Sequence, residues 1–184
     1  VGKWCADEAL MQELEKVPEL IENTFELSEA IKEKAERYRF ANECFVLARG
    51  TNYAIALESA LKIQETTYVR AKAYATSDFH HGPFAMIEKN MPVLVYAPKG
   101  SSLKDIQEMI MKLKSSEADL LIISNDNETL EMSACSFKMP DCSNDLISPF
   151  MNVVLGQMFA CSLALSKGLN PDAPRGLSKV TVTL

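Results

Sequence analysis

The sequence lacks the features that mark nucleic-acid-binding and membrane proteins. Its 19 lysine and arginine residues are outnumbered by 25 aspartate and glutamate residues. The resulting net charge of −6 argues against a surface for nucleic acid or anionic membranes. There is no apolar run of membrane-spanning length and no signal-peptide pattern at the N-terminus. We therefore expect a cytoplasmic protein that binds neither nucleic acid nor membrane.

Motifs for disulfides, metals and cofactors are also missing. The five cysteines are odd in number and form no C-x-x-C pair, so reduced cysteines are the simplest account. The adjacent histidines His80 and His81 make a poor metal site, because neighbouring histidines rarely converge on one ion and no third ligand is apparent. No dinucleotide-binding motif is present. We expect no organic cofactor and no metal.

What is present is the pattern of one α/β domain. The length of 184 residues and the hydrophobic content of 47% are ordinary for a single globular domain. Residues 1–40 carry apolar side chains at helical intervals and predict a helical arm. The start at Val1 rather than Met hints at a fragment of a longer protein, although a trimmed chain would look the same.

Residues 41–184 predict the domain itself, with a tail that is extended after Gly168. Short, continuously apolar segments alternate with helical patterns, and the segments are residues 44–48, 92–97, 119–124 and a shorter fourth at 136–139. Such segments indicate a three-layer, flavodoxin-like α/β fold, in which helices cover both faces of a parallel sheet. Ligands of such sheets bind beyond the carboxyl ends of the strands. Gly50 and the Lys99-Gly100 pair are expected at this rim.

A charged stripe marks the helix that follows Gly50. Glu58, Lys62 and Glu65 are spaced i, i+4 and i+7 and therefore share one face. The opposite face suits packing against a sheet and consists of Tyr53, Ala56, Ala60, Ile63 and Thr67. Two interpretations stay open for the stripe. It is either a set of solvated ion pairs, each worth a few tenths of a kcal/mol, or a group of catalytic side chains that faces an open pocket at the sheet rim.

Four motifs occur in a family-specific order. They are R-G-x-x-Y at Arg49–Tyr53, A-L-E-x-A-L-K-x-x-E at Ala56–Glu65, H-G-P at His81–Pro83 and P-R-x-L-x-K-x-V-T-V at Pro174–Val182. Together they resemble the second sugar isomerase (SIS) domain of the glucosamine-6-phosphate synthase family, whose relatives include two-SIS-domain deaminases and deglycases. The resemblance spans nearly the whole chain. It implies a SIS domain that is active in a homodimer and only together with an upstream SIS domain.

The resemblance also implies the chemistry. The family converts fructose 6-phosphate and glutamine-derived ammonia into glucosamine 6-phosphate. By resemblance, Glu65 is the base that moves a proton between C1 and C2, His81 assists ring opening and reaches the site of a neighbouring subunit, and Lys179 approaches the carbonyl carbon. These residue types suit proton transfer and amine chemistry. The alternatives are a helix-face ion pair for Glu65, a turn residue for His81 and a solvated tail lysine for Lys179.

Two departures from the family pattern shape the remaining expectations. Residues 97–102 stand where a serine-rich S-x-S-G-x-[ST] loop holds the sugar phosphate in the first SIS domain of the family. We therefore expect this chain to be the catalytic half, with the main phosphate site on a partner domain. The contacts to a hexose 6-phosphate or amino-sugar phosphate are assigned to Arg49, Gly50, Thr51 and Lys62. The S-D-F-H-H-G-P segment at Ser77–Pro83 keeps an amino-sugar-phosphate deaminase or deglycase open, and a non-catalytic sugar-phosphate sensor is the third alternative.

Overall fold

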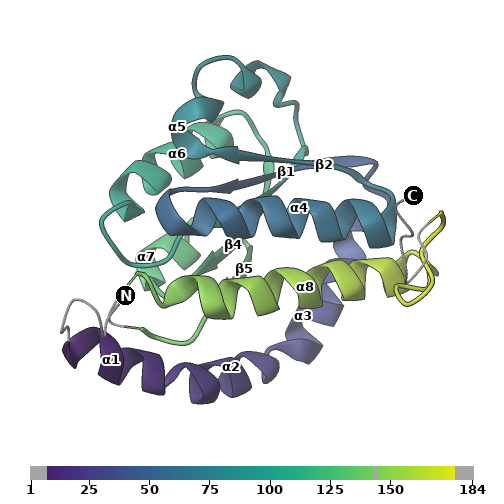
Figure 1. Cartoon of the computed structure of the whole chain (residues 1–184). Helices are drawn as coiled ribbons and strands as arrows, with labels where there is room; N and C mark the ends of the chain where they lie inside the picture. The colour runs from purple at the N-terminus through teal and green to yellow at the C-terminus, as the bar shows by residue number, and fades with distance from the viewer. Residues whose placement is uncertain (1–7, 143–144, 177–184) are drawn as a thin grey trace, which may run out of the picture.

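Five parallel strands form the centre of the protein in a computed structural model that describes residues 8–142 and 145–176. The strands are β1 (Glu43–Ala48), β2 (Arg70–Ala75), β3 (Pro92–Tyr96), β4 (Asp119–Ser124) and β5 (Cys135–Lys138). Their order in the sheet is β2-β1-β3-β4-β5, which is the flavodoxin-like order with its switch point between β1 and β3. The expected flavodoxin-like α/β fold is therefore confirmed (Figure 1).

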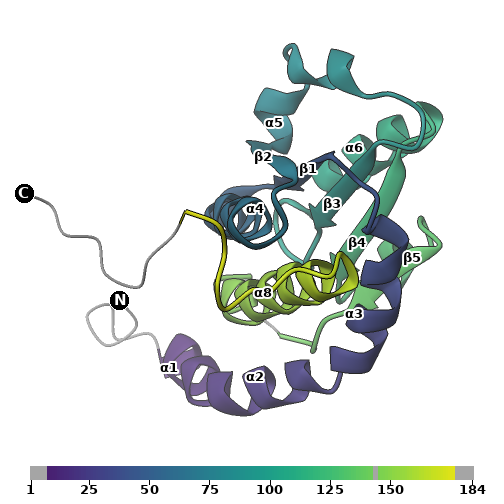
Figure 2. The same ribbon diagram turned by 90° about the vertical axis from the view of Figure 1, so that its right-hand side faces the viewer.

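Helices cover both faces of this sheet. The arm helices are α1 (Glu8–Glu15), α2 (Val17–Phe25) and α3 (Ser28–Ala35), and the turn η1 (Glu36–Tyr38) follows them. The later elements are, in chain order, the turn η2 (Gly50–Asn52), α4 (Tyr53–Thr67), α5 (Thr76–Phe79), η3 (Pro83–Met86), α6 (Leu103–Ser115), α7 (Asn127–Leu130) and α8 (Ser148–Ser166). Figure 2 shows α4 and α8 nearly end-on against one face, while α5 and α6 lie on the other. The arm packs on the α8 side.

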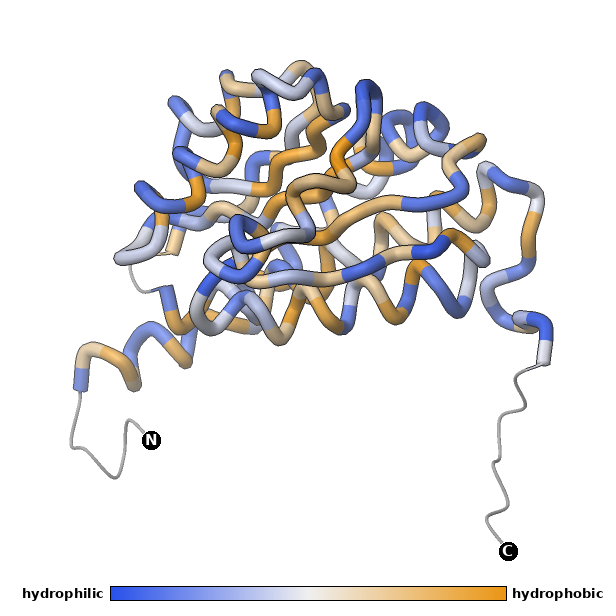
Figure 3. Tube along the Cα trace, turned by 90° about the horizontal axis from the view of Figure 1, so that it is seen from above, coloured by the Kyte–Doolittle hydropathy of each residue, from blue (hydrophilic) through white to orange (hydrophobic). Residues whose placement is uncertain are grey.

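Alternation along the strands divides the core into two clusters. In β1, Val46 and Ala48 pack with α4 and α8, whereas Phe45 and Leu47 pack with α5 and α6. This follows from the two-residue period of a strand, which sends successive side chains to opposite faces. Both faces of the central strands are thus apolar, as the continuous segments predicted. Along the surrounding helices, hydrophobic and hydrophilic residues alternate instead (Figure 3).

The arm is helical throughout its described part and is tied to the domain. Ile31 is fully buried in the α4–α8 cluster, and the ring of Tyr38 meets Phe159 edge-on at 5.8 Å between centroids. The Lys34 ammonium donates to the backbone oxygen of Ser136 in β5 at 2.6 Å. The boundary at residue 40 between arm and domain stays a prediction.

Strand β2 was not predicted from the sequence. It pairs in parallel with β1 at the edge of the sheet, with Arg70 opposite Glu43 and Ala75 opposite Ala48. An edge strand is only partly buried, so β2 alternates charged residues with alanine instead of forming a continuous apolar run. The alternation of residues 69–73 (V-R-A-K-A) is the signal that would have predicted it.

Helix α8 corrects the expectation on apolar runs. Among the described helices it is the one with the length and apolar composition to cross a membrane. Half of that stretch is buried inside the protein, however, including the uncharged polar side chain of Asn152. Burial of one long face against α4 and the sheet is the pattern of a core helix.

Candidate active site

The turn after β1 places three of the predicted residues around one hollow. Gly50 has a φ of +61°, a left-handed conformation that glycine adopts at little cost, and it starts η2 two residues after the end of β1. Arg49, Gly50 and Thr51 line a cavity of about 240 Å³ together with residues that follow β3 and precede α8. This rim cavity lies at the carboxyl ends of β1 and β3, where the sequence placed a ligand site.

The two charged residues that line the rim cavity, Arg49 and Asp145, each have a partner elsewhere in this chain. The Arg49 guanidinium lies 3.2 Å from a carboxylate oxygen of Asp105. On the other side, Asp145 Oδ2 accepts hydrogen bonds from the backbone N–H of Ser101 at 3.4 Å and from its hydroxyl at 3.3 Å. Among the described residues that line the hollow, the one arginine therefore already has an acidic partner.

The charged stripe on α4 forms as the spacing predicted. The Lys62 ammonium donates to Glu65 Oε2 at 2.8 Å and lies 3.8 Å from Glu58 Oε1. Its hydrogen bond to Glu65, together with the charges of both carboxylates, raises the pKa of Lys62, although partial burial acts in the opposite direction. The side chains of Glu58, Lys62 and Glu65 remain 33%, 33% and 30% exposed. Both carboxylates are thus oriented by one cation and still open to a ligand.

The stripe is not at the sheet rim, and this expectation was wrong. Helix α4 starts at the rim and runs back along the sheet, as the helix of a parallel crossover must. Glu65 lies 12 residues after Tyr53, which corresponds to about 18 Å along the helix axis. The residues that line the rim cavity accordingly do not include Glu65. Instead, the last turns of α4 lie beside α8 (Figure 1), where the Thr66 hydroxyl donates to the backbone oxygen of Ala160 at 3.4 Å.

The beginning of the C-terminal motif lies next to the end of α4. The guanidinium of Arg175 lies 3.9 Å from the centre of the Tyr68 ring, and its backbone N–H donates to the Tyr68 hydroxyl at 2.7 Å. Tyr68 caps α4 in a left-handed conformation with a φ of 60°, three residues after Glu65. Lys179 lies outside the described residues, so its predicted role remains a prediction.

The predicted histidine is exposed and lies on the other face of the sheet. His81 follows α5, and its N–H donates to the backbone oxygen of Asp78 at 3.1 Å. The neighbouring Phe79 is fully buried against α6 and the strands, away from the cluster that contains α4. Partial burial and the nearby ammonium of Lys112 lower the pKa of the adjacent His80. Within this chain His81 is therefore not brought together with Glu65.

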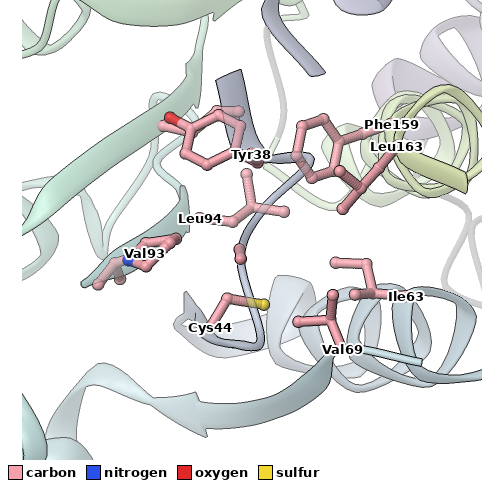
Figure 4. Close-up of a pocket in the computed structure, with 11 residues that line it drawn as sticks. Tyr38, Cys44, Ile63, Val69, Val93, Leu94, Phe159 and Leu163 are labelled. Carbon is pink, nitrogen blue, oxygen red and sulfur yellow. The ribbon is translucent and has the colours of Figure 1, made fainter. Parts of the chain in front are cut away.

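A small apolar cavity near the amino ends of the central strands β1 and β3 is not a sugar site. It measures about 20 Å³ and is lined by side chains such as Tyr38, Cys44 and Phe159 (Figure 4). This is room for about one water molecule, far below the volume of a hexose phosphate. Burial raises the pKa of the Cys44 thiol to about 12, so that cysteine stays protonated and unreactive.

Sequence reasoning missed a polar network that joins the rim to α8. The Asn152 amide donates to Asn52 Oδ1 at 2.7 Å, and the Asn52 amide donates to the Ser148 hydroxyl at 2.8 Å. Ser148 in turn donates to the backbone oxygen of Asp145 at 2.8 Å. Ser148 and Pro149 are the first two residues of α8, and Ile147 is its N-cap residue. The link from Ser148 to Asn52, 96 residues earlier, had no local signal.

Comparisons with known proteins agree with this architecture. The SIS domain family model matches residues 38–167. The chain is 36% identical over 178 residues to a glutamine–fructose-6-phosphate aminotransferase (isomerizing) of Aquifex aeolicus, covering 96% of this chain and 30% of that protein. It is also 36% identical to the enzyme of the same name from Thermococcus kodakarensis, covering 95% of this chain and 29% of that protein. The chain thus spans about three-tenths of the length of these curated relatives.

Solved structures give the same assignment. The C-terminal domain of glucosamine-fructose-6-phosphate aminotransferase from Francisella tularensis matches with a TM-score of 0.81 and 25% identity, covering 88% of this chain and 46% of that one. A glucosamine-6-phosphate deaminase from Thermotoga maritima matches with a TM-score of 0.69 and 25% identity, covering 96% of this chain and 50% of that one. The family match, the curated relatives and the sheet order together establish that the chain belongs to the SIS domain family.

Proposed function

We propose that this chain is the catalytic SIS half of an isomerizing glutamine–fructose-6-phosphate aminotransferase, and that Glu65 moves the proton between C1 and C2 of the sugar phosphate. The observation that carries the proposal is the pair of Glu65 and Lys62, joined at 2.8 Å on a partly exposed helix face. The 36% identity to enzymes of that name, across nearly the whole chain, supports the substrate class. We propose a cytoplasmic location on the same basis.

The position of Glu65 supports a site that a second domain completes. None of the cavities described above encloses the Glu65 carboxylate, yet this carboxylate stays partly exposed on the side of α4 beside α8. Leu57 and Leu61 on α4 and Leu165 on α8 are 49%, 44% and 58% exposed. Exposed leucines on the two neighbouring helices α4 and α8 are suited to an interface. The proposed occupant is an upstream SIS domain, which would contribute the phosphate-binding loop that this chain lacks.

The other catalytic assignments follow the same division of labour. His81 is exposed and lies on the far face of the sheet, which suits a role in a neighbouring subunit of a homodimer. Lys179 follows Arg175 by four residues, a span of at most about 14 Å. Arg175 contacts the ring of Tyr68, and Tyr68 follows Glu65 by three residues. Lys179 therefore belongs to a segment that starts beside the proposed base. Lys62 orients Glu65 and adds a positive charge for the substrate.

The test compares two glutamates of the same stripe. In the full-length protein, Glu65→Gln should lower turnover at least about a hundredfold, in the range of general-base catalysis, with little change in substrate binding. Glu58→Gln is the matched control, because Glu58 also contacts Lys62 and is nearly equally exposed. We expect it to change turnover only a few-fold. Near-normal turnover in Glu65→Gln would remove this residue from the mechanism.

Isotope exchange separates the enzyme from a non-catalytic sensor. An isomerase exchanges the substrate hydrogen at C1 or C2 with solvent, whereas a sensor binds the sugar phosphate without exchange. Wild-type protein should therefore incorporate deuterium from D₂O, and Glu65→Gln should not. Release of ammonia from glucosamine 6-phosphate, without a glutamine requirement, would instead favour a deaminase, as in the relative from Thermotoga maritima.

A further inference from the structure

The rim cavity is lined by a carboxylate of the chain itself, that of Asp145. Asp145 lies in the segment before α8 and lines the cavity across from β1. Both hydrogen bonds to its Oδ2 come from Ser101, at the entrance to α6. Backbone N–H groups of the first turn of a helix attract negative charge, and Ser101 lies directly before the N-cap residue of α6, Ser102. Here that negative charge is already present.

The backbone of Asp145 is anchored, and Gly100 leaves space for its side chain. The backbone oxygen of Asp145 accepts from Ser148, which is fully buried and receives the Asn52 amide. A Cβ added at Gly100 would lie 2.6 Å from both Cβ and Oδ2 of Asp145. Gly100 has a φ of +153° and leaves just the space that the aspartate fills. The half-buried Asp145 side chain therefore lies in the space beside Gly100, at the wall of the cavity.

The positively charged residue that lines the cavity, Arg49, also has a partner. Arg49, the one arginine or lysine that lines the cavity among the described residues, contacts Asp105 of α6 at 3.2 Å. Two groups that could bind an anion, the Arg49 guanidinium and the Ser101 N–H, thus each have an acidic partner from this chain. A phosphate entering the cavity would meet the negative charge of Asp145 at close range, where like charges repel strongly.

We propose that Asp145 is an internal substitute for phosphate, and that it excludes phosphate esters from the rim cavity of this domain. The cavity keeps the position and helix start of an anion site, while the aspartate determines that no sugar phosphate binds there. This departs from the expectation that Arg49, Gly50 and Thr51 bind substrate. It does not depend on the role of Glu65, so it can fail or succeed separately from the proposed function.

The test uses inorganic phosphate as the probe and the whole chain as the protein. Phosphate is titrated into wild-type protein, Asp145→Asn and Asp145→Ala at constant ionic strength, and the amide signals of Ser101 and Ser102 are followed by NMR. The first variant removes the charge and keeps the shape, while the second also opens the space. Both keep the backbone contact to Ser148. We expect saturable binding in either variant that is at least about tenfold tighter than in wild type.

Asp141→Asn is the matched control, because Asp141 is an exposed acid of the same segment that does not line the rim cavity. It changes the net charge equally and should leave phosphate binding at the wild-type level. Urea unfolding of each variant establishes that the protein is folded. Equal phosphate affinity in wild type and Asp145→Ala would overturn the proposal, as would an absence of binding in both Asp145 variants or an equal gain in Asp141→Asn.

Discussion

Replacing Gly156 by alanine should destabilise the protein, against the usual trend for a glycine inside a helix. Gly156 lies in the middle of α8 and is buried against α4 and β3. A Cβ at this position would collide with Ser59 Oγ and the Tyr96 hydroxyl, and would lie 3.2 Å from Ser59 Cβ. Those two oxygens form a buried hydrogen bond of 2.7 Å. The methyl group therefore has no space unless this pair separates.

The expected change in the free energy of unfolding combines one stabilising and two destabilising contributions. Glycine to alanine in a helix gains roughly 0.5–1 kcal/mol. Overpacking costs roughly 1–3 kcal/mol, and leaving two buried hydroxyls without partners costs about 1–3 kcal/mol more. We expect a net loss of about 3 kcal/mol in the free energy of unfolding, which for a chain of this size lowers Tm by about 6–12 °C.

Urea unfolding at pH 7 measures this loss, and two comparisons isolate its cause. Gly168→Ala is the control, because Gly168 has a φ of +72° and no atom within 4 Å of the added Cβ. It should lose only about 1 kcal/mol, from backbone strain. In a Ser59→Ala/Tyr96→Phe background, which removes both oxygens, Gly156→Ala should cost at least about 1 kcal/mol less than in wild type. A Gly156→Ala protein as stable as wild type would refute the packing argument.

Three further predictions concern single side chains. Asp126 caps α7 by accepting hydrogen bonds from Thr129, and these bonds lower the pKa of the Asp126 carboxyl below 3.8. Asp126→Ala should therefore lower the free energy of unfolding by about 1 kcal/mol at pH 7. Because a carboxyl with a lowered pKa stabilises the fold only above its unfolded pKa, this loss should fade when urea unfolding is repeated well below pH 3.8. Iodoacetamide mapping by mass spectrometry should label the exposed Cys161 in native protein but Cys44, with its pKa of about 12, only after unfolding, and native labelling of Cys44 would contradict its burial. Arg175→Ala should leave the unfolding midpoint unchanged within error and should lower turnover of the full-length protein about fivefold, which corresponds to the energy of one exposed cation–π contact. Arg175→Lys should recover part of the turnover. Unchanged turnover in Arg175→Ala would mean that this contact does not position the tail.

The predictable part of the fold rests on local patterns. Continuous apolar segments predicted β1, β3, β4 and the short β5, and the charged spacing of α4 predicted which of its faces would be buried. The four motifs placed the chain in its family. Each of these signals is contained within about 20 neighbouring residues, so hydrophobic periodicity and motif spacing suffice to read it.

The tertiary structure decided where those local features lie relative to one another. The sequence defined the stripe of Glu58, Lys62 and Glu65, but the direction of α4 along the sheet carried it away from the rim and beside α8. The partner of Ser101 is Asp145, 44 residues later, and no local pattern pairs them. A single sequence specifies periodicity along the chain, whereas contacts between distant segments arise only when the elements pack, and both the proposed base and the internal anion depend on such contacts.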